Sequence, residues 1–245
     1  MPLSFKISKW IKQNVLDASA KGCILGLSGG VDSAVAALLC RRAFPENTLA
    51  LILPCHSQKE DILHAKEFAR EFNIKFQEVD LTNIFESFYA SLEGKKYSGE
   101  RNLCVANLKP RLRMSALYYF ANKLNYLVVG TGNKSELQMG YFTKYGDGGV
   151  DVLPLGDLLK NEVRKLAAEL KVPKEIIEKA PTAGLWPGQT DEGEMGISYA
   201  ELDRILAGQS NGVAEDKIDL VNKRRELSRH KRALPHIFTS TTKGD

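Results

Sequence analysis

Apolar residues along the first half of the chain alternate between two spacings, which predicts strands separated by helices. Over residues 3–20 they recur every three or four positions, the spacing of an amphipathic helix. Residues 23–27 form an apolar run that is too short for a helix and suits a buried strand. Similar runs or alternations at 48–54, 74–80 and 126–130 predict three further strands.

Helical patterns follow each of these strands. Residues 34–44 are rich in alanine and leucine, and a capping box of Ser57 and Glu60 predicts a helix that reaches about Phe72. Further helices are predicted over 105–124 and 160–170. Strands separated by helices predict an α/β fold, a doubly wound, mostly parallel sheet with helices on both faces, as in Rossmann-like proteins.

Two segments lack such a pattern and are predicted to be long loops. Residues 93–102 are almost entirely polar, and residues 181–197 contain four glycines and two prolines. Long loops in compact domains are usually lids or disordered segments. We expect the loops near 82–102 and 183–197 to close over a ligand.

The turn after the first strand has the composition of a phosphate-binding loop. It reads Ser28-Gly-Gly-Val-Asp-Ser33 and leads directly into a predicted helix. Glycines allow a close backbone approach, and the N–H groups at the start of a helix attract anions. Asp32 adds a carboxylate that could hold a metal bound to phosphate. A plain turn with a helix cap is the alternative, but strand, glycines, serines and acid together favour the phosphate.

This loop is not a Walker A loop, because no Gly-x4-Gly-Lys-Ser/Thr string occurs in the chain. The string Ser-Gly-Gly-x-Asp-Ser resembles the pyrophosphate loop of enzymes that split ATP into AMP and pyrophosphate. Such enzymes activate a carboxylate, amide or carbonyl oxygen as an adenylate. The resemblance does not by itself select a substrate.

Two later segments also suit a nucleotide. Ligands of parallel sheets bind at the carboxyl ends of the strands, and small polar residues follow the fourth strand over 130–136. There Glu136 could share a cation with Asp32, although an ordinary glycine turn is the alternative. Residues 140–151 interleave aromatic, charged and glycine residues, which suits a recognition loop or equally a surface loop. Arg111 and Arg113 are two positions apart on one predicted helix, so at most one of them faces a given ligand.

Composition limits the class of protein. The 245 residues are long enough for one large domain, with 43% hydrophobic and 26% charged residues, a globular balance. The net charge of +4 suits anionic small molecules but lacks the dense basic stripe of a nucleic-acid binder. The four cysteines have no metal-ligand spacing and are expected to be reduced and inert. No secretory signal or membrane-length apolar run is present, so a cytoplasmic enzyme is expected.

Together these segments closely resemble the ammonia-dependent NAD synthetase family, over nearly the whole chain and in the expected order. The matching strings are Ser28-Gly-Gly-Val-Asp-Ser33, Asn107-x3-Arg-x-Arg, Gly-Thr-Gly-Asn-Lys-Ser-Glu136, Phe-Thr-Lys-Tyr-Gly-Asp-Gly, Pro181-Thr-Ala-Gly-Leu-Trp-Pro-Gly-Gln-Thr-Asp-Glu192, Gly196-Ile-Ser-Tyr199 and His230-Lys-Arg. The chain departs at Gly184, where some members carry Asp. The resemblance implies the adenine nucleotide alpha hydrolase-like version of the predicted fold, in a single domain over 1–245.

The resemblance also implies a role for individual residues. ATP would be held by Gly26, Leu27, Ser28, Gly29, Gly30, Val31, Asp32, Ser33, Thr131, Lys160 and Thr182. Deamido-NAD would be bound by Arg111, Lys144, Asp151, His230 and Lys231. Mg²⁺ would be bound by Asp32 and Glu136, and Asp32 and Lys160 would be catalytic. Asp147 and Asp151 are candidates for deprotonating ammonium by position only.

The implied reaction is the amidation of deamido-NAD by ammonia, the last step of NAD biosynthesis. The nicotinate carboxylate attacks the α-phosphate of ATP, pyrophosphate leaves, and ammonia converts the acyl adenylate to NAD and AMP. Only 22 residues precede Cys23, which lies in a predicted strand. No glutaminase domain with a catalytic cysteine is therefore expected, and free ammonia should be the nitrogen donor. The resemblance implies a homodimer, with no nucleic-acid or membrane partner.

Two alternatives differ in kind. Another pyrophosphate-loop enzyme, such as a tRNA-modifying lysidine or thiolation enzyme, should carry a basic appendage or a reactive cysteine pair, and neither occurs. A non-catalytic nucleotide-binding module would bind ATP without releasing pyrophosphate.

Overall fold

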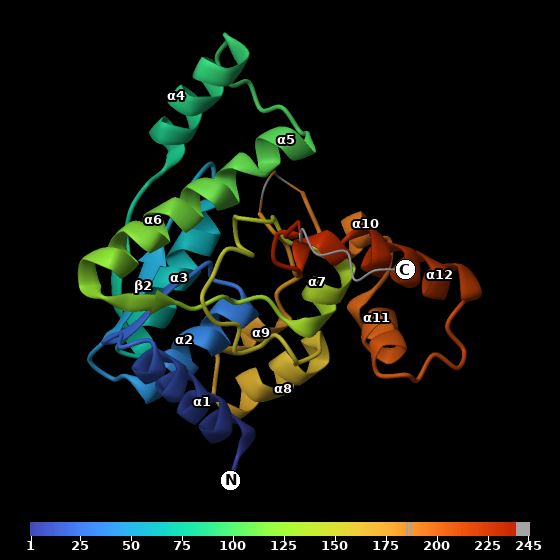
Figure 1. Cartoon of the computed structure of the whole chain (residues 1–245), viewed down its shortest axis with the longest axis horizontal. Helices are drawn as coiled ribbons and strands as arrows, with labels where there is room; N and C mark the ends of the chain where they lie inside the picture. The colour runs from blue at the N-terminus through green and yellow to red at the C-terminus, as the bar shows by residue number, and fades with distance from the viewer. Residues whose placement is uncertain (185, 187, 239–245) are drawn as a thin grey trace.

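A parallel four-stranded sheet forms the centre of the protein (Figure 1). The structure is a computed structural model that describes residues 1–184, 186 and 188–238. The strands are β1 (Gly22–Gly26), β2 (Thr48–Ile52), β3 (Lys75–Glu78) and β4 (Tyr126–Val128). All pairings are parallel, in the order β3-β2-β1-β4. The predicted parallel α/β architecture is confirmed.

Helices account for most of the remaining described chain. Those of the sheet-forming part are α1 (Leu3–Asp17), α2 (Val31–Ala43), α3 (Lys59–Glu71), α4 (Thr82–Glu93), α5 (Leu103–Ala106), α6 (Leu108–Leu124) and α7 (Lys134–Met139). The later ones are α8 (Lys160–Glu169), α9 (Lys174–Glu178), α10 (Asp191–Met195), α11 (Tyr199–Leu206), α12 (Glu215–Leu227) and the 3-10 turn η1 (Arg229–Lys231).

The two faces of the sheet bury separate apolar layers. Cys23 and Leu25 of β1 pack in the layer that contains α1, α2, α3 and α8. Ile24 lies between them in sequence and packs in the layer with α4 and α6. Side chains alternate between the faces of a strand, so the apolar run of β1 supplies both layers. A third apolar cluster joins α7, α10, α11 and α12 at one side of the molecule (Figure 1).

The order of the strands locates the ligand-binding edge. The chain moves outward from β1 through β2 to β3 and then returns to β4 on the other side of β1. Strand order therefore reverses between β1 and β4, where open α/β sheets bind ligands at the carboxyl ends of the strands. The glycine loop follows β1 at this edge, and the segment 129–133 follows β4.

Three sequence predictions are corrected by the structure. Ser57 does not cap α3, which starts after Gln58, because its hydroxyl accepts hydrogen bonds from Cys55 N and Arg113 Nη2 instead. The helix expected over 105–124 is divided at Asn107 into α5 and α6. The lid loop expected near 82–102 is largely helix α4, whose buried Phe85 and Tyr89 fix it to the second apolar layer.

The polar segment 94–102 is attached to this layer as well. The Tyr97 ring lies 5.0 Å from Phe85 and 5.3 Å from Tyr89, measured between ring centroids. Glu100 accepts a hydrogen bond of 2.8 Å from the Tyr89 hydroxyl. None of the helices in the described ranges is long and apolar enough to cross a membrane.

Candidate active site

The glycine loop between β1 and α2 requires glycine at its second position. Gly29 has φ +81, and a Cβ there would lie 2.6 Å from the carbonyl oxygen of Asp61 in α3. Both the backbone conformation and the close approach of α3 exclude a side chain. Gly30 is the N-cap of α2 and no side chain caps it. The first N–H groups of this 13-residue helix therefore remain available to an anion.

We expect Gly29→Ala to weaken ATP binding and to lower the free energy of unfolding by about 1–3 kcal/mol, from backbone strain together with the clash at Asp61. Gly94→Ala is a matched control, because Gly94 has φ +68 but no atom within 4 Å of its Cβ position. It should lose stability from strain alone and keep its affinity for ATP. Urea unfolding and ATP titration measure both effects, and equal ATP binding by the two variants would contradict the close-approach argument.

The two serine hydroxyls hold the loop in shape. The Ser33 hydroxyl donates to the carbonyl of Gly30 (2.9 Å) and accepts from the backbone N–H of Ser28 (3.2 Å). The Ser28 hydroxyl lies 3.1 Å from that of Ser33 and accepts from Gly30 N at 3.3 Å. Leu27 and Val31 anchor the loop at both ends because they are buried in the first apolar layer.

A buried lysine joins the two carboxylates that the sequence assigns to a metal. Lys160 Nζ donates to Asp32 Oδ2 at 2.6 Å and to Glu136 Oε1 at 3.1 Å. The Lys160 residue is only 2% exposed. Three elements far apart in sequence, the starts of α2, α7 and α8, thus meet at this cluster. The ends of β1 and β4 bring the first two of them together.

Burial and charge shift the titration of these groups. Burial and, after it, the neighbouring Asp32 raise the pKa of Glu136 to about 7, although Lys160 opposes both. Burial alone would lower the pKa of Lys160, but Asp32 and Glu136 outweigh it and raise that pKa above its ordinary value. Lys160 is therefore a permanent cation in a site of low polarity.

Three further side chains complete this cluster, and the sequence had given none of them a role: Asn133, Tyr199 and Asp191. Asn133 Nδ2 donates to Asp32 Oδ1 at 2.8 Å and caps α7, whose Glu136 completes a capping box. The Tyr199 hydroxyl lies 3.3 Å from Glu136 Oε1 and 3.0 Å from Asp191 Oδ2. Asn133, Tyr199 and Asp191 all occur in the sequence strings that carry the family resemblance, so their functional role could have been found there. Their residue types alone did not distinguish them from the polar residues beside them.

Asp203 of α11 helps to position Lys160, because it is hydrogen-bonded to residues that fix the start of α8. Its Oδ1 accepts a hydrogen bond from the Ser135 hydroxyl (2.5 Å) and its Oδ2 accepts one from the N–H of Asn161 (2.8 Å). The Ser135 oxygen in turn accepts from Lys160 N at 3.0 Å. Asp203 is 3% exposed, so this carboxylate caps α8 inside the protein.

We expect Asp203→Ala to lower the free energy of unfolding by about 2 kcal/mol, because it removes a charged helix cap and leaves buried donors unpaired. Turnover should fall with it, since the start of α8 carries Lys160. Asp219→Ala, an exposed change on α12, is the control. Urea unfolding is the measurement, and unchanged stability of Asp203→Ala would contradict the capping role.

A second group of the expected residues gathers beside the loop 140–145. Lys144 Nζ donates to the carbonyl of His230 (2.7 Å), and Lys231 Nζ donates to the carbonyls of Gly140 and Phe142 (2.8 Å each). Arg111 Nη2 is 3.5 Å from the carbonyl of Lys144. These contacts join α6, the recognition loop and η1. The structure therefore brings Arg111, Lys144, His230 and Lys231 together.

The neighbouring arginine has a different environment. Arg113 Nε donates to the carbonyl of Leu53 at 3.0 Å, and its Nη2 donates to Ser57 Oγ at 3.2 Å. It therefore connects α6 to the segment after β2, whereas Arg111 is exposed. The expectation that the two arginines point to different sides of one helix is confirmed.

The remaining site residues stand apart from these two groups. Asp151 accepts hydrogen bonds from the Tyr118 hydroxyl (2.9 Å) and from Val128 N (2.7 Å), so it supports the end of β4. Thr131 follows β4 at the ligand-binding edge. Thr182 is exposed, and its hydroxyl accepts from Gly184 N at 3.1 Å. Gly184 has φ +61, so the Asp of other family members would need a left-handed backbone here.

The aspartates considered for deprotonating ammonium are both already engaged. Asp147 Oδ1 accepts from Thr143 N at 2.9 Å, and burial raises its pKa while Arg113 and Lys231 lower it. Asp151 is held as described above. In the described ranges no group of three or more His, Cys, Asp or Glu side chains could hold a metal.

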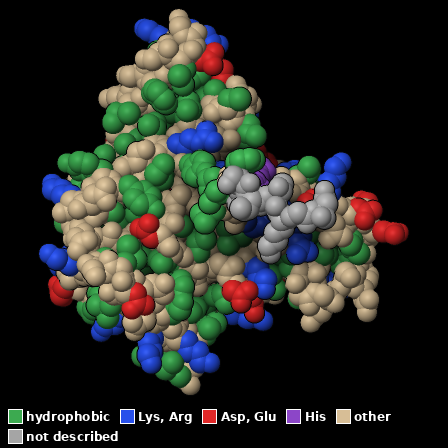
Figure 2. All heavy atoms as spheres, viewed as in Figure 1, with side chains coloured by type: hydrophobic (Ala, Val, Ile, Leu, Met, Phe, Trp, Pro, Cys, Tyr) green, Lys and Arg blue, Asp and Glu red, His purple; other side chains and the backbone are tan. Residues whose placement is uncertain are grey.

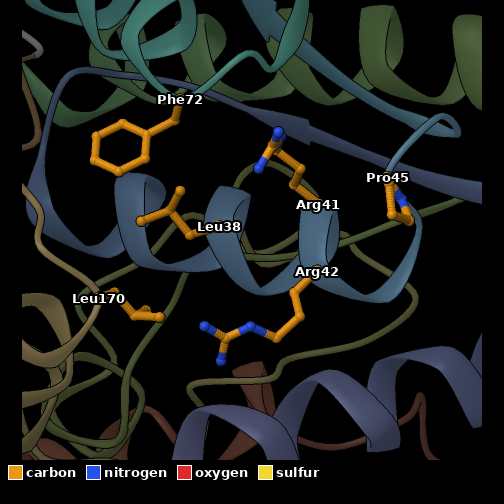
Figure 3. A pocket seen from close by; sticks show the side chains of 6 residues that line it. All are labelled: Leu38, Arg41, Arg42, Pro45, Phe72 and Leu170. Atoms are coloured by element: carbon orange, nitrogen blue, oxygen red, sulfur yellow. The ribbon is translucent and has the colours of Figure 1, made fainter.

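One hollow of the molecule lies away from these groups. It measures about 400 Å³ and is lined by Leu38, Arg41, Arg42, Pro45, Phe72 and Leu170 (Figure 3). These residues surround the carboxyl end of α2, whereas the glycine loop is at its amino end. Arg42 is held over the Phe5 ring, 4.4 Å from its centroid, and Arg41 Nε donates to the carbonyl of Asn73. This hollow is not the site of the predicted chemistry.

The parallel sheet with its Ser-Gly-Gly-Val-Asp-Ser turn at the switch point defines an α/β protein of the pyrophosphate-loop class. Within that class the chain belongs to the NAD synthase family, whose model matches residues 3–235. A Carboxydothermus hydrogenoformans protein named NH(3)-dependent NAD(+) synthetase is 47% identical over 233 residues, which cover 95% of each chain.

Two solved structures are similar over the same length. The NMN synthetase from Francisella tularensis has a TM-score of 0.90 at 40% identity and covers 98% of both chains. The NH3-dependent NAD synthetase from Campylobacter jejuni subsp. jejuni, in complex with the nitrate ion, has a TM-score of 0.79 at 30% identity. It covers 97% of this chain and 98% of that chain.

Proposed function

We propose that this protein converts deamido-NAD to NAD with ATP and ammonia, releasing AMP and pyrophosphate through an acyl adenylate. The observation that carries this function is the meeting of Asp32, Glu136 and Lys160 beside an uncapped helix start, in a member of the NAD synthase family. This cluster can hold a polyphosphate and the charge that develops when its α-phosphorus is transferred.

The first half-reaction requires stabilisation of negative charge rather than a base. The nicotinate carboxylate attacks the α-phosphorus of ATP, and pyrophosphate takes the bonding electron pair. Backbone N–H groups at Gly29 and Gly30 and the cationic Lys160 are fixed before the reaction, so they stabilise the developing charge without reorganisation. Thr131 and Thr182 are further ATP contacts in this proposal, as the family resemblance implies, and Thr131 follows β4 at the ligand-binding edge of the sheet.

The donor set fits Mg²⁺. Asp32 and Glu136 present hard carboxylate oxygens on both sides of one cation, the ammonium group of Lys160. Mg²⁺ is usually held by one or two carboxylates together with substrate phosphates, so two protein ligands are sufficient. When bound, Mg²⁺ would neutralise negative charge on the phosphate oxygens.

The group at the recognition loop would bind the pyridine nucleotide. Arg111, Lys144, His230 and Lys231 supply positive charge and donors for its phosphates and hydroxyls. Asp151 stays in the proposal as a ribose acceptor, with Tyr118 and Val128 N holding its carboxylate in place. The second half-reaction needs a dry site, because water would hydrolyse the adenylate. Closure is therefore proposed for 183–197, of which residues 185 and 187 lie outside the described residues.

A homodimer is the proposed assembly. Ile84, Phe88 and Leu92 are spaced four apart on α4, and they are 54%, 44% and 59% exposed. Figure 2 shows exposed apolar side chains over α4 and along α6. A single apolar face on a projecting helix favours contact with a second copy of the chain.

We expect Phe88→Lys to shift the protein from dimer to monomer in sedimentation equilibrium, because it places a charge in the apolar face of α4. Glu86→Lys on the same helix is the matched control and should leave the dimer intact. A dimeric Phe88→Lys protein, or a monomeric wild type, would contradict the proposed interface.

We also propose that residues 1–245 act as one domain in the cytoplasm, with free ammonia as the nitrogen donor. The four free cysteines, three of them buried, fit a reducing compartment. The nitrogen donor follows the name of the relative from Carboxydothermus.

One observation favours a second substrate. The NMN synthetase matches this structure with the higher of the two TM-scores, and its name indicates a mononucleotide product. Nicotinate mononucleotide carries the same reactive carboxylate as deamido-NAD but lacks the adenylate half. The protein could therefore amidate the mononucleotide with the same cluster.

The deciding experiment compares both substrates. The purified protein is incubated with ATP, Mg²⁺ and ammonium, together with either deamido-NAD or nicotinate mononucleotide, and AMP, pyrophosphate and amide are quantified. A higher kcat/KM for deamido-NAD supports NAD synthesis, and the reverse supports the second function. Release of ADP and orthophosphate, or no amide from either compound, would overturn both.

A further inference from the structure

A buried carboxylate oxygen next to the catalytic cluster has no hydrogen-bond partner among the described residues. It is Oδ1 of Asp191, at the start of α10 in the closing segment. Asp191 is 5% exposed, and its other oxygen accepts from the Tyr199 hydroxyl at 3.0 Å. Burying an acceptor without a donor is costly, so an unpaired oxygen here indicates a ligand that donates.

The surroundings of this oxygen carry an excess of negative charge. Tyr199 has one hydroxyl proton for two carboxylates, Glu136 at 3.3 Å and Asp191 at 3.0 Å. Lys160 is the cation of the cluster and already forms salt bridges with Asp32 and Glu136. Asp191 Oδ1 is therefore left without a donor, and no salt bridge to Asp191 forms among the described residues. The missing group should supply both.

We propose that Asp191 Oδ1 and the Tyr199 hydroxyl oxygen form the binding position for the ammonium ion that is consumed in the second half-reaction. This inference rests on the proposed function and names the part of the site that takes the nitrogen donor. Ammonium is small, positively charged and can only donate hydrogen bonds, which matches an unpaired carboxylate oxygen.

The side chain of Lys160 ends in an ammonium group, so its surroundings show that this region can accommodate such a cation. Its head group lies 4.9 Å from the centroid of the Tyr199 ring and between two carboxylates. The aromatic face attracts cations, and carboxylates accept their N–H groups. Asp191 offers the same kind of acceptor on the other side of the Tyr199 hydroxyl.

The position of Asp191 on α10 connects capture of the nitrogen donor to closure. α10 is held by Glu194, which accepts hydrogen bonds from the Tyr141 hydroxyl (2.6 Å) and Gln189 Nε2 (2.8 Å). Ammonium bound at Asp191 would thus be enclosed together with the adenylate. Ammonium has no lone pair, so it must first give a proton to the Asp191 carboxylate, the free acceptor at this position. The ammonia that remains attacks the activated carbonyl, AMP leaves, and the closed site excludes competing water.

The test separates the two half-reactions in Asp191→Asn, which preserves shape and removes the charge. We expect the KM for ammonium to rise about tenfold or more, as for loss of a hydrogen bond to a charged group. The KM values for ATP and the pyridine nucleotide should stay near wild type. So should pyridine-nucleotide-dependent exchange of labelled pyrophosphate into ATP, because this exchange reports adenylation without ammonia.

Two matched measurements make the result specific. Glu192→Gln removes the neighbouring charge on α10 but keeps an oxygen that can accept from the backbone N–H of Tyr199, so it should leave the KM for ammonium unchanged. Hydroxylamine, a nucleophile that is uncharged at neutral pH, should lose less kcat/KM than ammonium in Asp191→Asn. Tyr199→Phe, which removes only the hydroxyl, should also raise the KM for ammonium and serves if Asp191→Asn does not fold.

The inference is overturned if the KM for ammonium is unchanged in both variants, or if pyrophosphate exchange falls in parallel with turnover. The second outcome would assign Asp191 to adenylation or to folding. Failure of the proposed function looks different, because wild-type protein would then show neither pyrophosphate exchange nor AMP release with either pyridine nucleotide.

Discussion

Replacement of Asp32 by alanine is expected to reduce turnover by roughly 10²–10³-fold or more, the usual loss when a fixed electrostatic group of a transition state is removed. Asp32 has two functions in the structure. Its Oδ2 receives Lys160 at 2.6 Å and its Oδ1 receives Asn133 at 2.8 Å, and it lies in the first turn of α2. The variant therefore loses the proposed ligand for Mg²⁺ and the orientation of Lys160. Quantification of AMP and pyrophosphate measures the loss.

Asp157→Ala is the matched control. Asp157 pairs with Lys134 at 2.9 Å, but its side chain is 95% exposed, so the change should leave turnover unaffected. Asp32→Asn, which keeps the shape of the side chain, should need a higher Mg²⁺ concentration for half-maximal activity. Near-full activity of Asp32→Ala, with circular dichroism showing a native fold, would refute the role assigned to Asp32.

The second large effect is expected for Lys160→Met. Removal of one partner from a buried ion pair leaves uncompensated charge, so the free energy of unfolding without Mg²⁺ should fall by about 3–5 kcal/mol. Turnover should fall by roughly 10²–10³-fold, because Lys160 is the fixed cation of the phosphate site. Added Mg²⁺ should recover more stability in the variant than in wild type, since the two carboxylates then have no competing partner.

Thermal unfolding with and without Mg²⁺, together with pyrophosphate release, measures both effects. Lys134→Met removes the half-buried lysine paired with the exposed Asp157 and should change neither quantity appreciably. If Lys160→Met were as stable as wild type without Mg²⁺, the buried cluster would not have the electrostatic imbalance that the structure indicates. Wild-type turnover of the variant would exclude Lys160 from catalysis.

The strands and the glycine loop could be predicted because their signals are local. The apolar run of β1 predicts burial on both faces, and the loop residues carry their phosphate chemistry whatever surrounds them. Boundaries were less predictable. Ser57 has the spacing of a capping box with Glu60, yet a hydrogen bond from Arg113, 56 residues away, takes its hydroxyl. A partner this remote is invisible to local patterns.

The amphipathic character of α4 is present in the sequence, yet the segment is predicted there as part of a loop. Its apolar residues recur every three or four positions and form one broad stripe, of which Phe85 and Tyr89 are buried and Ile84, Phe88 and Leu92 are exposed. Only the tertiary structure decides which part of this stripe is buried. The buried aromatic contacts of Tyr97 then attach the following polar residues to the same layer.

The sequence alone determined the parallel α/β architecture, the anion-binding turn and the resemblance to a family, since each depends on residue type and short spacing. Only the tertiary structure decided which charged groups meet. Lys160 is 128 residues from Asp32, and Asp191 meets Glu136 through Tyr199. Their joining depends on the order in which parallel strands pair and on the caps that fix α7 and α8. Pairing of this kind is set by packing between distant segments, and no local pattern encodes it.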